Sequence, residues 1–109
     1  MLSLALNDRV LFEAQAAKAA RLLRALSNER RLMILCQLGE GELSVGALQT
    51  RVSLSQSALS QHLALLRAEG LVATRREAQT IFYSIADPAA VRVIATLADI
   101  FCPEPKENP

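Results

Sequence analysis

The chain has 109 residues and a net charge of +1, and its residues are 51% hydrophobic but only 4% aromatic. This length fits one domain with a real core, and the near-neutral charge permits binding to nucleic acid without demanding it. No apolar run approaches the roughly 20 residues that a membrane-spanning helix needs, so we expect no membrane partner.

The N-terminal residues predict a protein without a targeting segment. Residues 1–6 are mostly apolar, but no basic residue precedes them, and the polar residues Asn7, Asp8 and Arg9 follow at once. We therefore expect no signal peptide and a cytoplasmic location. The surplus of Leu, Ala, Val and Ile favours a subunit interface, because that is where excess aliphatic surface is usually buried.

Two helices are predicted in the first third of the chain. Residues 8–26 are rich in Ala and Leu, with spaced Lys and Arg residues, which is typical of a helix. Ser27 is the expected N-cap of a second helix that runs to about Leu38 and ends at two nearby glycines. Its middle, residues 32–36, is apolar on every side, so we expect this helix at the centre of the core.

Two short helices with a tight polar connection follow. Ser44 is the expected N-cap of a helix over residues 45–51, and residues 53–55 break that helix. Ser55 can then cap a helix over residues 56–68, which stops before a glycine. This arrangement is the helix-turn-helix pattern.

A β-hairpin is predicted next. Residues 71–76 and 80–85 are rich in Val, Thr, Ile, Phe and Tyr and are joined through residues 77–79. Ala78 stands where a turn glycine is common, which leaves the geometry of the turn open.

The last predicted helix covers residues 89–102, with Asp87 as its N-cap and Pro88 in its first turn. The order of elements is then helix, helix, helix-turn-helix, hairpin, helix. We therefore predict a mainly α fold with a β-hairpin wing, a winged helix-turn-helix, as one domain over residues 1–102. The Pro- and Glu-containing tail, residues 103–109, is expected to be disordered.

The helix over residues 56–68 has two contrasting faces on a helical wheel. Leu59, Leu63 and Leu66 fall together on an apolar arc. The opposite arc carries small neutral side chains, namely Ser57, Ser60, Gln61, Ala64 and Ala68. Such a face can lie flush in the major groove, where Gln can pair with adenine and Ser can meet base edges or phosphates. The N-terminal positions would enter deepest, and these are Gln56, Ser57, Ser60 and Gln61.

The predicted wing adds Arg75 and Arg76, which can straddle the minor groove or its phosphates. Without the neighbouring helix-turn-helix and hairpin, the polar side of residues 56–68 would be interpreted as a solvated helix face, and Arg75 and Arg76 as residues of a solvated strand edge.

His62, the only histidine, falls in the apolar arc, so we interpret it as a half-buried, hydrogen-bonded structural residue, with a phosphate contact as the alternative. One histidine without neighbouring ligands cannot complete a metal site.

Residues 54–72, LSQSALSQHLALLRAEGLV, together with Arg75, Arg76 and residues 81–83, resemble the ArsR/SmtB family of winged-helix repressors. Residues 26–36 are similar to that family's second helix. The resemblance covers roughly residues 20–102. It implies a homodimer built through the first and last helices, which binds double-stranded operator DNA and loses it when an inducer acts.

The chain departs from the metal sensors of this family. Residues 45–51 contain no Cys or His, and the last helix offers only Asp87 and Asp99, so we expect no metal and no cofactor. Cys36 and Cys102 instead resemble the sulfide- and persulfide-responsive branch of the family. That resemblance implies that a disulfide or polysulfide bridge links the two cysteines, that reactive sulfur species are the inducer, and that the bridge releases DNA.

The two cysteines form no CxxC motif, and thiols in the cytoplasm are reduced by default, so a bond between them would be conditional. Cys102 shares a stripe with Ile94 and Phe101 that should face the core or a dimer interface, and Cys36 lies in the apolar helix. We therefore expect both thiols to be tucked against neighbouring helices. A polysulfide bridge spans more distance than a disulfide, which needs Cα atoms within about 7 Å.

Three other interpretations remain open at this point. The cysteines can be inert small hydrophobic residues in a repressor without a switch, or they can respond to another oxidant or to a thiophilic metal. The fold can also serve as a protein-interaction module without DNA. An enzyme is disfavoured, because no His, and no Lys or Arg adjacent in sequence, is available to activate either thiol.

Overall fold

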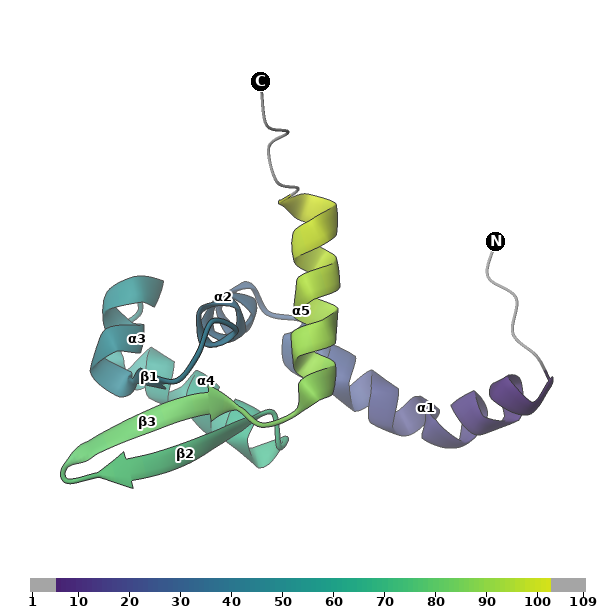
Figure 1. Ribbon diagram of the computed structural model, residues 1–109, viewed down its shortest axis with the longest axis horizontal. Helices are drawn as coiled ribbons and strands as arrows, with labels where there is room; N and C mark the ends of the chain where they lie inside the picture. The colour runs from purple at the N-terminus through teal and green to yellow at the C-terminus, as the bar shows by residue number, and fades with distance from the viewer. Residues whose placement is uncertain (1–5, 103–109) are drawn as a thin grey trace, which may run out of the picture.

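The computed structural model describes residues 6–102, and over these residues the chain is a winged helix-turn-helix (Figure 1). The helices are α1 (Leu6–Leu26), α2 (Glu29–Leu38), α3 (Val45–Val52), α4 (Gln56–Ala68) and α5 (Pro88–Phe101). The strands are β1 (Leu43–Ser44), β2 (Val72–Glu77) and β3 (Thr80–Ile85). The predicted fold class is confirmed, while the predicted disordered tail, residues 103–109, lies outside the described residues.

The start of α2 differs from the prediction. Its N-cap is Asn28, whose side-chain oxygen accepts hydrogen bonds from the backbone of Arg30 at 2.9 Å and of Arg31 at 3.1 Å. Ser27 is not the cap, because its hydroxyl donates instead to the carbonyl of Arg24 at 2.8 Å and so serves the end of α1. The prediction of Ser27 was therefore wrong by one residue.

The other three predicted caps are confirmed. Ser44, Ser55 and Asp87 each accept a hydrogen bond from a backbone N–H in the first turn of the following helix. Between α3 and α4 the chain turns at Ser53, which has a left-handed φ of 52°. A side-chain cap directly after this turn fixes where α4 begins, and α4 has the bounds that the sequence predicted.

The sheet contains one strand that the sequence did not predict. Its order is β1-β3-β2, and β1 adds only Leu43 and Ser44, which pair antiparallel with Tyr83 and Phe82. Two residues are too few to show an alternating pattern. The hairpin forms as predicted, with Ala78 in the left-handed region at a φ of 57°, a conformation that costs a non-glycine residue about 1 kcal/mol.

The core joins α2 and α4 beneath the sheet. On α4 the buried residues are Leu59, Leu63 and Leu66, and on α2 they are Ile34, Leu35 and Leu38. The expectation that α2 lies at the centre of the core is confirmed, because α2 contacts α1, α3, α4, α5 and β3, although Met33 is 45% exposed and Cys36 is exposed. One face of α2 is enough to fill the space above α4, so the opposite face of α2 stays outside.

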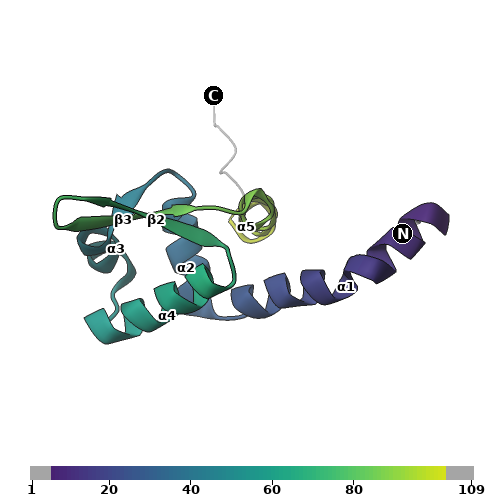
Figure 2. The ribbon, with the colours of Figure 1, turned by 90° about the horizontal axis from the view of Figure 1, so that it is seen from below.

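The two terminal helices project from this core in different directions. α1 and the tip of the hairpin lie at opposite ends of the molecule, and α5 rises from the end of β3 (Figures 1 and 2). The radius of gyration is 16.4 Å, whereas a compact chain of about 100 residues has about 13 Å. None of the helices between residues 6 and 102 is long and apolar enough to cross a membrane.

The burial of the leucines on α4 predicts how the free energy of unfolding changes when a leucine is replaced by alanine. Leu59→Ala should lower the free energy of unfolding by about 2–5 kcal/mol, because it leaves a cavity in a fully buried site. Leu65→Ala, on the same helix but 39% exposed, should cost less than half as much. Urea unfolding at one fixed protein concentration measures both, and equal losses would contradict the orientation of α4.

Candidate nucleic-acid interface

The small neutral side chains of α4 form one exposed face. All five residues that the helical wheel placed opposite the leucines are exposed: Ser57, Ser60, Gln61, Ala64 and Ala68. Gln56 is exposed as well. Because Leu59, Leu63 and Leu66 hold the other side of α4 in the core, this face points away from the body of the protein. We call it the α4 outer face.

The wing places its two arginines on opposite sides of the sheet. Arg76 stands opposite Ile81 in the register, and Arg75 stands opposite Phe82. Successive residues of a strand face opposite ways, so Arg76 shares a side with buried Val72, the side that packs on the helices. Arg75 lies on the outer side. Both arginines are exposed, as a nucleic-acid contact requires, but they do not form one patch.

Arg75 already has partners within the chain. Its guanidinium forms ion pairs with Glu42 at 2.7 Å and with Glu77 at 3.1 Å, and it lies 4.6 Å from the centre of the Phe82 ring. Glu42 could not be found from the sequence, because nothing there indicates that the residue before β1 lies beside the wing. The only usable signal was β1 itself, which is too short to detect.

His62 is half-buried, as its position on the apolar arc predicted, but none of the side-chain hydrogen bonds within residues 6–102 involves its imidazole, so the expected hydrogen bond is not found there. Burial lowers the pKa of His62, and the nearby positive charges of Arg31 and Arg30 lower it further. The imidazole is therefore mostly neutral near pH 7. This environment supports the structural interpretation of His62 over a phosphate contact, which would favour the charged form.

The two cysteines are free, and both are exposed in the single chain. The expectation that both thiols are tucked against neighbouring helices is therefore wrong within one protomer. On α2 the core takes the face with Ile34 and Leu38, and Cys36 lies on the opposite side. On α5 the inward contacts end near Leu97, so Cys102 lies on a last turn that extends past the core.

The apolar stripe predicted for α5 is also turned differently. The side that packs inward carries Ala90, Val93 and Ile94, whereas Phe101 of the predicted stripe is exposed on the last turn beyond the core, and Val91 is exposed on another side of the helix. α5 is apolar on two sides, and the intramolecular core covers only one of them.

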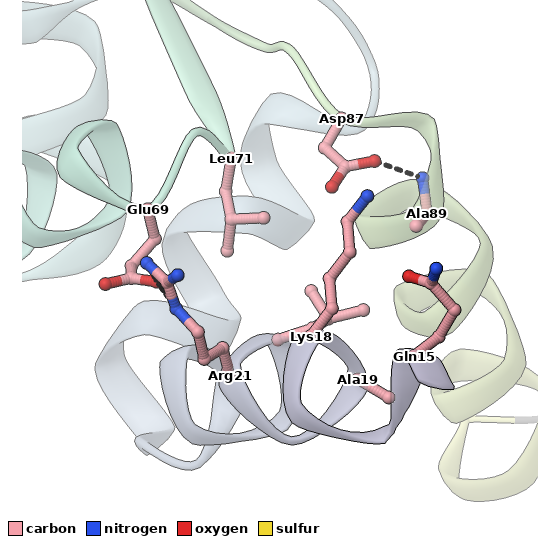
Figure 3. A pocket seen from close by; sticks show the side chains of 9 residues that line it. Gln15, Lys18, Ala19, Arg21, Glu69, Leu71, Asp87 and Ala89 are labelled. Carbon is pink, nitrogen blue, oxygen red and sulfur yellow. Dashed lines mark hydrogen bonds and ion pairs between the residues drawn. The ribbon is translucent and has the colours of Figure 1, made fainter. Parts of the chain in front are cut away.

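A cavity of about 390 Å³ lies between α1, the end of α4 and the start of α5 (Figure 3). Three of its charged side chains already have partners. Arg21 pairs with Glu69 at 3.1 Å, and Asp87 caps α5 through the backbone of Ala89. The Lys18 side chain extends into the cavity toward Asp87 (Figure 3). Within residues 6–102, no group of three or more His, Cys, Asp or Glu residues is placed to hold a metal ion.

Residues 28–74 match a family described as bacterial regulatory proteins of the arsR family. The chain is also 56% identical over 90 residues to the transcriptional activator HlyU of Vibrio cholerae, a match that covers 83% of each chain. The chain belongs to the ArsR family. The matched region runs from the N-cap of α2 into β2, so it includes the helix-turn-helix and the first strand of the wing.

Solved structures of family relatives agree with this fold. Reduced HlyU from Vibrio cholerae N16961 is 55% identical with a TM-score of 0.79, over 84% of this chain and 96% of that one. The repressor BigR from Xylella fastidiosa is 42% identical with a TM-score of 0.83, over 88% and 98%. Mb0332 from Mycobacterium bovis, described as a homodimeric winged helix-turn-helix DNA-binding domain, is 32% identical with a TM-score of 0.70, over 92% and 89%.

Family membership and fold together make this ArsR-family chain a DNA-binding transcription regulator and not an enzyme. The resemblance that the sequence suggested is thereby confirmed at the level of the family. The family relatives differ in the sign of regulation, since HlyU is named an activator and BigR a repressor.

The environment of His62 predicts a dependence of stability on pH. Its pKa is lowered in the folded state from an ordinary value of 6.5, so the unfolded chain binds the proton more readily. The stability that comes from keeping His62 neutral in the folded state is therefore fully present above about pH 6.5, and it is lost as the pH falls below that value. The free energy of unfolding should fall between about pH 8 and about pH 5.5 in urea experiments.

His62→Gln is the matched control, because glutamine has a similar size and does not titrate in this range. It should remove most of the change between the two pH values. A wild-type protein that becomes more stable toward pH 5.5, or a variant that keeps the full dependence, would contradict this environment.

Proposed function

We propose that this ArsR-family protein is a homodimeric repressor that binds operator DNA through α4 and the wing, and that releases DNA when a disulfide or polysulfide bridge links Cys36 and Cys102. The observation that carries the DNA-binding part is the exposed, small and uncharged α4 outer face, which follows directly after the tight turn at Ser53. A helix with such a face can approach base edges, because no bulky side chain holds it away.

The residues expected to meet DNA are those at the N-terminal end of α4. Gln56, Ser57, Ser60 and Gln61 are exposed and lie within about two turns of the Ser55 cap. In helix-turn-helix proteins this end of the second helix enters the major groove deepest. A glutamine can pair with adenine through two hydrogen bonds, and serine hydroxyls can contact bases or phosphates.

The wing supplies the positive charge that the α4 outer face lacks. Arg75 and Arg76 are the candidate contacts to the phosphate backbone or the minor groove. Arg76 takes part in none of the ion pairs formed within residues 6–102. Its guanidinium can therefore bind a phosphate without first breaking an ion pair.

A duplex selected by the wild-type protein from a random-sequence library tests DNA binding directly. Gln61→Ala should weaken binding to that duplex by about 1–3 kcal/mol and leave binding to a scrambled duplex unchanged. Glu40→Gln, at an exposed residue of the loop after α2, is the control and should bind as wild type. If no sequence is enriched, or if Gln61→Ala binds the selected duplex as wild type, the assignment of the α4 outer face is wrong.

The homodimer is supported by apolar surface that the single chain leaves uncovered. The exposed large hydrophobic residues lie mainly on the two terminal helices: Val10, Leu11, Phe12, Leu23, Val91, Ile100 and Phe101. Phe101 is 75% exposed, which is unfavourable for a side chain of that size in water. A second copy that packs its own α1 and α5 against this surface would cover it, and a two-fold axis would present two α4 helices to DNA.

The sulfur-sensing part rests on the placement of the two thiols. Cys36 is exposed on α2, Cys102 is exposed at the end of α5, and these two helices contact each other. Residues 98–102 are all exposed, so the last turn of α5 can move toward α2 without opening the core. In a dimer built through α5, this movement would change the spacing of the two α4 helices, which must match half-sites about 34 Å apart.

The chemistry needs no oxidant other than the sulfur donor. One thiolate takes the outer sulfur of a donor persulfide, and the donor leaves as a thiolate. The second thiolate then attacks the cysteine-bound sulfur of that new persulfide, which forms the disulfide and expels hydrosulfide. When the second cysteine has also accepted a sulfur, the same attack gives a trisulfide.

Treatment with a polysulfide tests the switch. The wild-type protein should release the selected duplex and show a mass change that corresponds to a bridge, with two hydrogens lost and zero or more sulfur atoms gained. Cys36→Ser and Cys102→Ser should each stay bound under the same treatment, and dithiothreitol should restore binding by the wild type. Release by Cys36→Ser equal to that of the wild type would leave a plain repressor with inert cysteines.

A further inference from the structure

An ion pair ties the wing to the loop that leads into the helix-turn-helix. Arg75 of β2 donates from Nη2 to Glu42 Oε1 at 2.7 Å and from Nε to Glu42 Oε2 at 3.0 Å. Two hydrogen bonds to both oxygens of one carboxylate form the geometrically most specific pair that arginine makes with an acid. The pair joins residues 33 positions apart in the sequence, and Glu42 directly precedes β1.

The same guanidinium is held by its own hairpin. Nη1 donates to Glu77 Oε2 at 3.1 Å, and the guanidinium carbon lies 4.6 Å from the centre of the Phe82 ring. Phe82 is the cross-strand neighbour of Arg75 on one side and of Ser44 on the other. The Arg75 side chain therefore lies across β3 on the outer side of the sheet, from β2 to the start of β1.

This placement matters because α2, α3 and α4 contact the wing from its inner side, and the Glu42–Arg75 pair adds a polar link on its outer side. β3 is joined to β1 through only two residue pairs, and the tip of the hairpin reaches past α3 (Figure 1). Ser44, the residue of β1 opposite Phe82, is also the N-cap of α3. The Glu42–Arg75 pair thus connects the wing to the point where the helix-turn-helix begins.

We propose that Glu42 and Arg75 are positioning residues for DNA binding, which hold the wing at a fixed angle to α4, and that Arg76 is the wing arginine that contacts phosphate. This assignment rests on the proposed DNA-binding function and divides the two arginines by role. A phosphate that bound Arg75 would first have to displace two carboxylates and a ring face. Arg76 lies on the other side of β2, in register with Ile81, on the side that faces the helices.

Both members of the pair stay charged in ordinary buffers. The hydrogen bonds from Arg75 lower the pKa of Glu42, and the two glutamates raise the pKa of Arg75. The pair is solvent-exposed, so salt weakens it, and its role is to limit the orientations of the wing more than to stabilise the fold.

The salt dependence of DNA binding separates positioning from contact. With the full-length chain and the selected duplex, Arg76→Gln should reduce the slope of log affinity against log salt by about 0.9 for each protomer, because one phosphate contact is lost. Arg75→Gln and Glu42→Gln should each lower affinity about two- to fivefold with the slope unchanged, and the double variant should bind no worse than either single one.

Arg75→Lys gives an independent test. A lysine can serve a phosphate as a point charge but cannot make the paired hydrogen bonds to Glu42, so we expect the affinity of Arg75→Gln and not that of the wild type. The assignment is overturned if Arg75→Gln lowers the slope as Arg76→Gln does, if Arg75→Lys binds as wild type, or if Glu42→Gln binds as tightly as wild type or more tightly. Failure of the wild-type protein to select any duplex would instead overturn the proposed function.

Discussion

The buried leucine stripe of α4 is the constraint on which the rest of this structure depends. Leu59, Leu63 and Leu66 are held against α2, and their burial fixes the rotation of α4 about its own axis. Once that rotation is set, the face with Gln61 and Ser60 has to point outward. The caps at both ends of the α3–α4 turn then fix where along the chain this face begins. The exposed α4 outer face is therefore a consequence of core packing.

The terminal helices bury only part of their apolar surface in the core of their own chain. α5 uses one apolar side for the core of its own chain, and α1 and the second side of α5 remain uncovered. In a monomer this surface would be exposed to water. In a dimer the same residues would form the interface that sets the distance between the two α4 helices. The proposed thiol switch acts at this junction, because Cys102 ends the helix that serves both the core and the uncovered surface. The wing is oriented separately, through the Glu42–Arg75 pair that links it to the residue before β1.

Local patterns in the sequence were sufficient to predict the helices, the hairpin, three of the four predicted caps and the faces of α4, because each depends on residues within a few positions of one another. What the sequence missed depends on neighbours that are distant in the chain. Asn28 caps α2 in place of Ser27, because Ser27 is drawn to the end of α1. Cys36 and Cys102 are exposed because the core uses only one face of α2 and stops short of the last turn of α5. Glu42 could not be assigned a role without β1, whose two residues carry no pattern.

Dimethyl sulfate footprinting of the selected duplex measures whether α4 reads the major groove as one of two copies. This reagent methylates guanine N7 in the major groove and adenine N3 in the minor groove. We expect two clusters of protected guanine N7 atoms whose centres lie about one helical turn apart, as two α4 helices on a two-fold axis require. Protection confined to adenine N3, or a single unpaired cluster, would contradict this expectation.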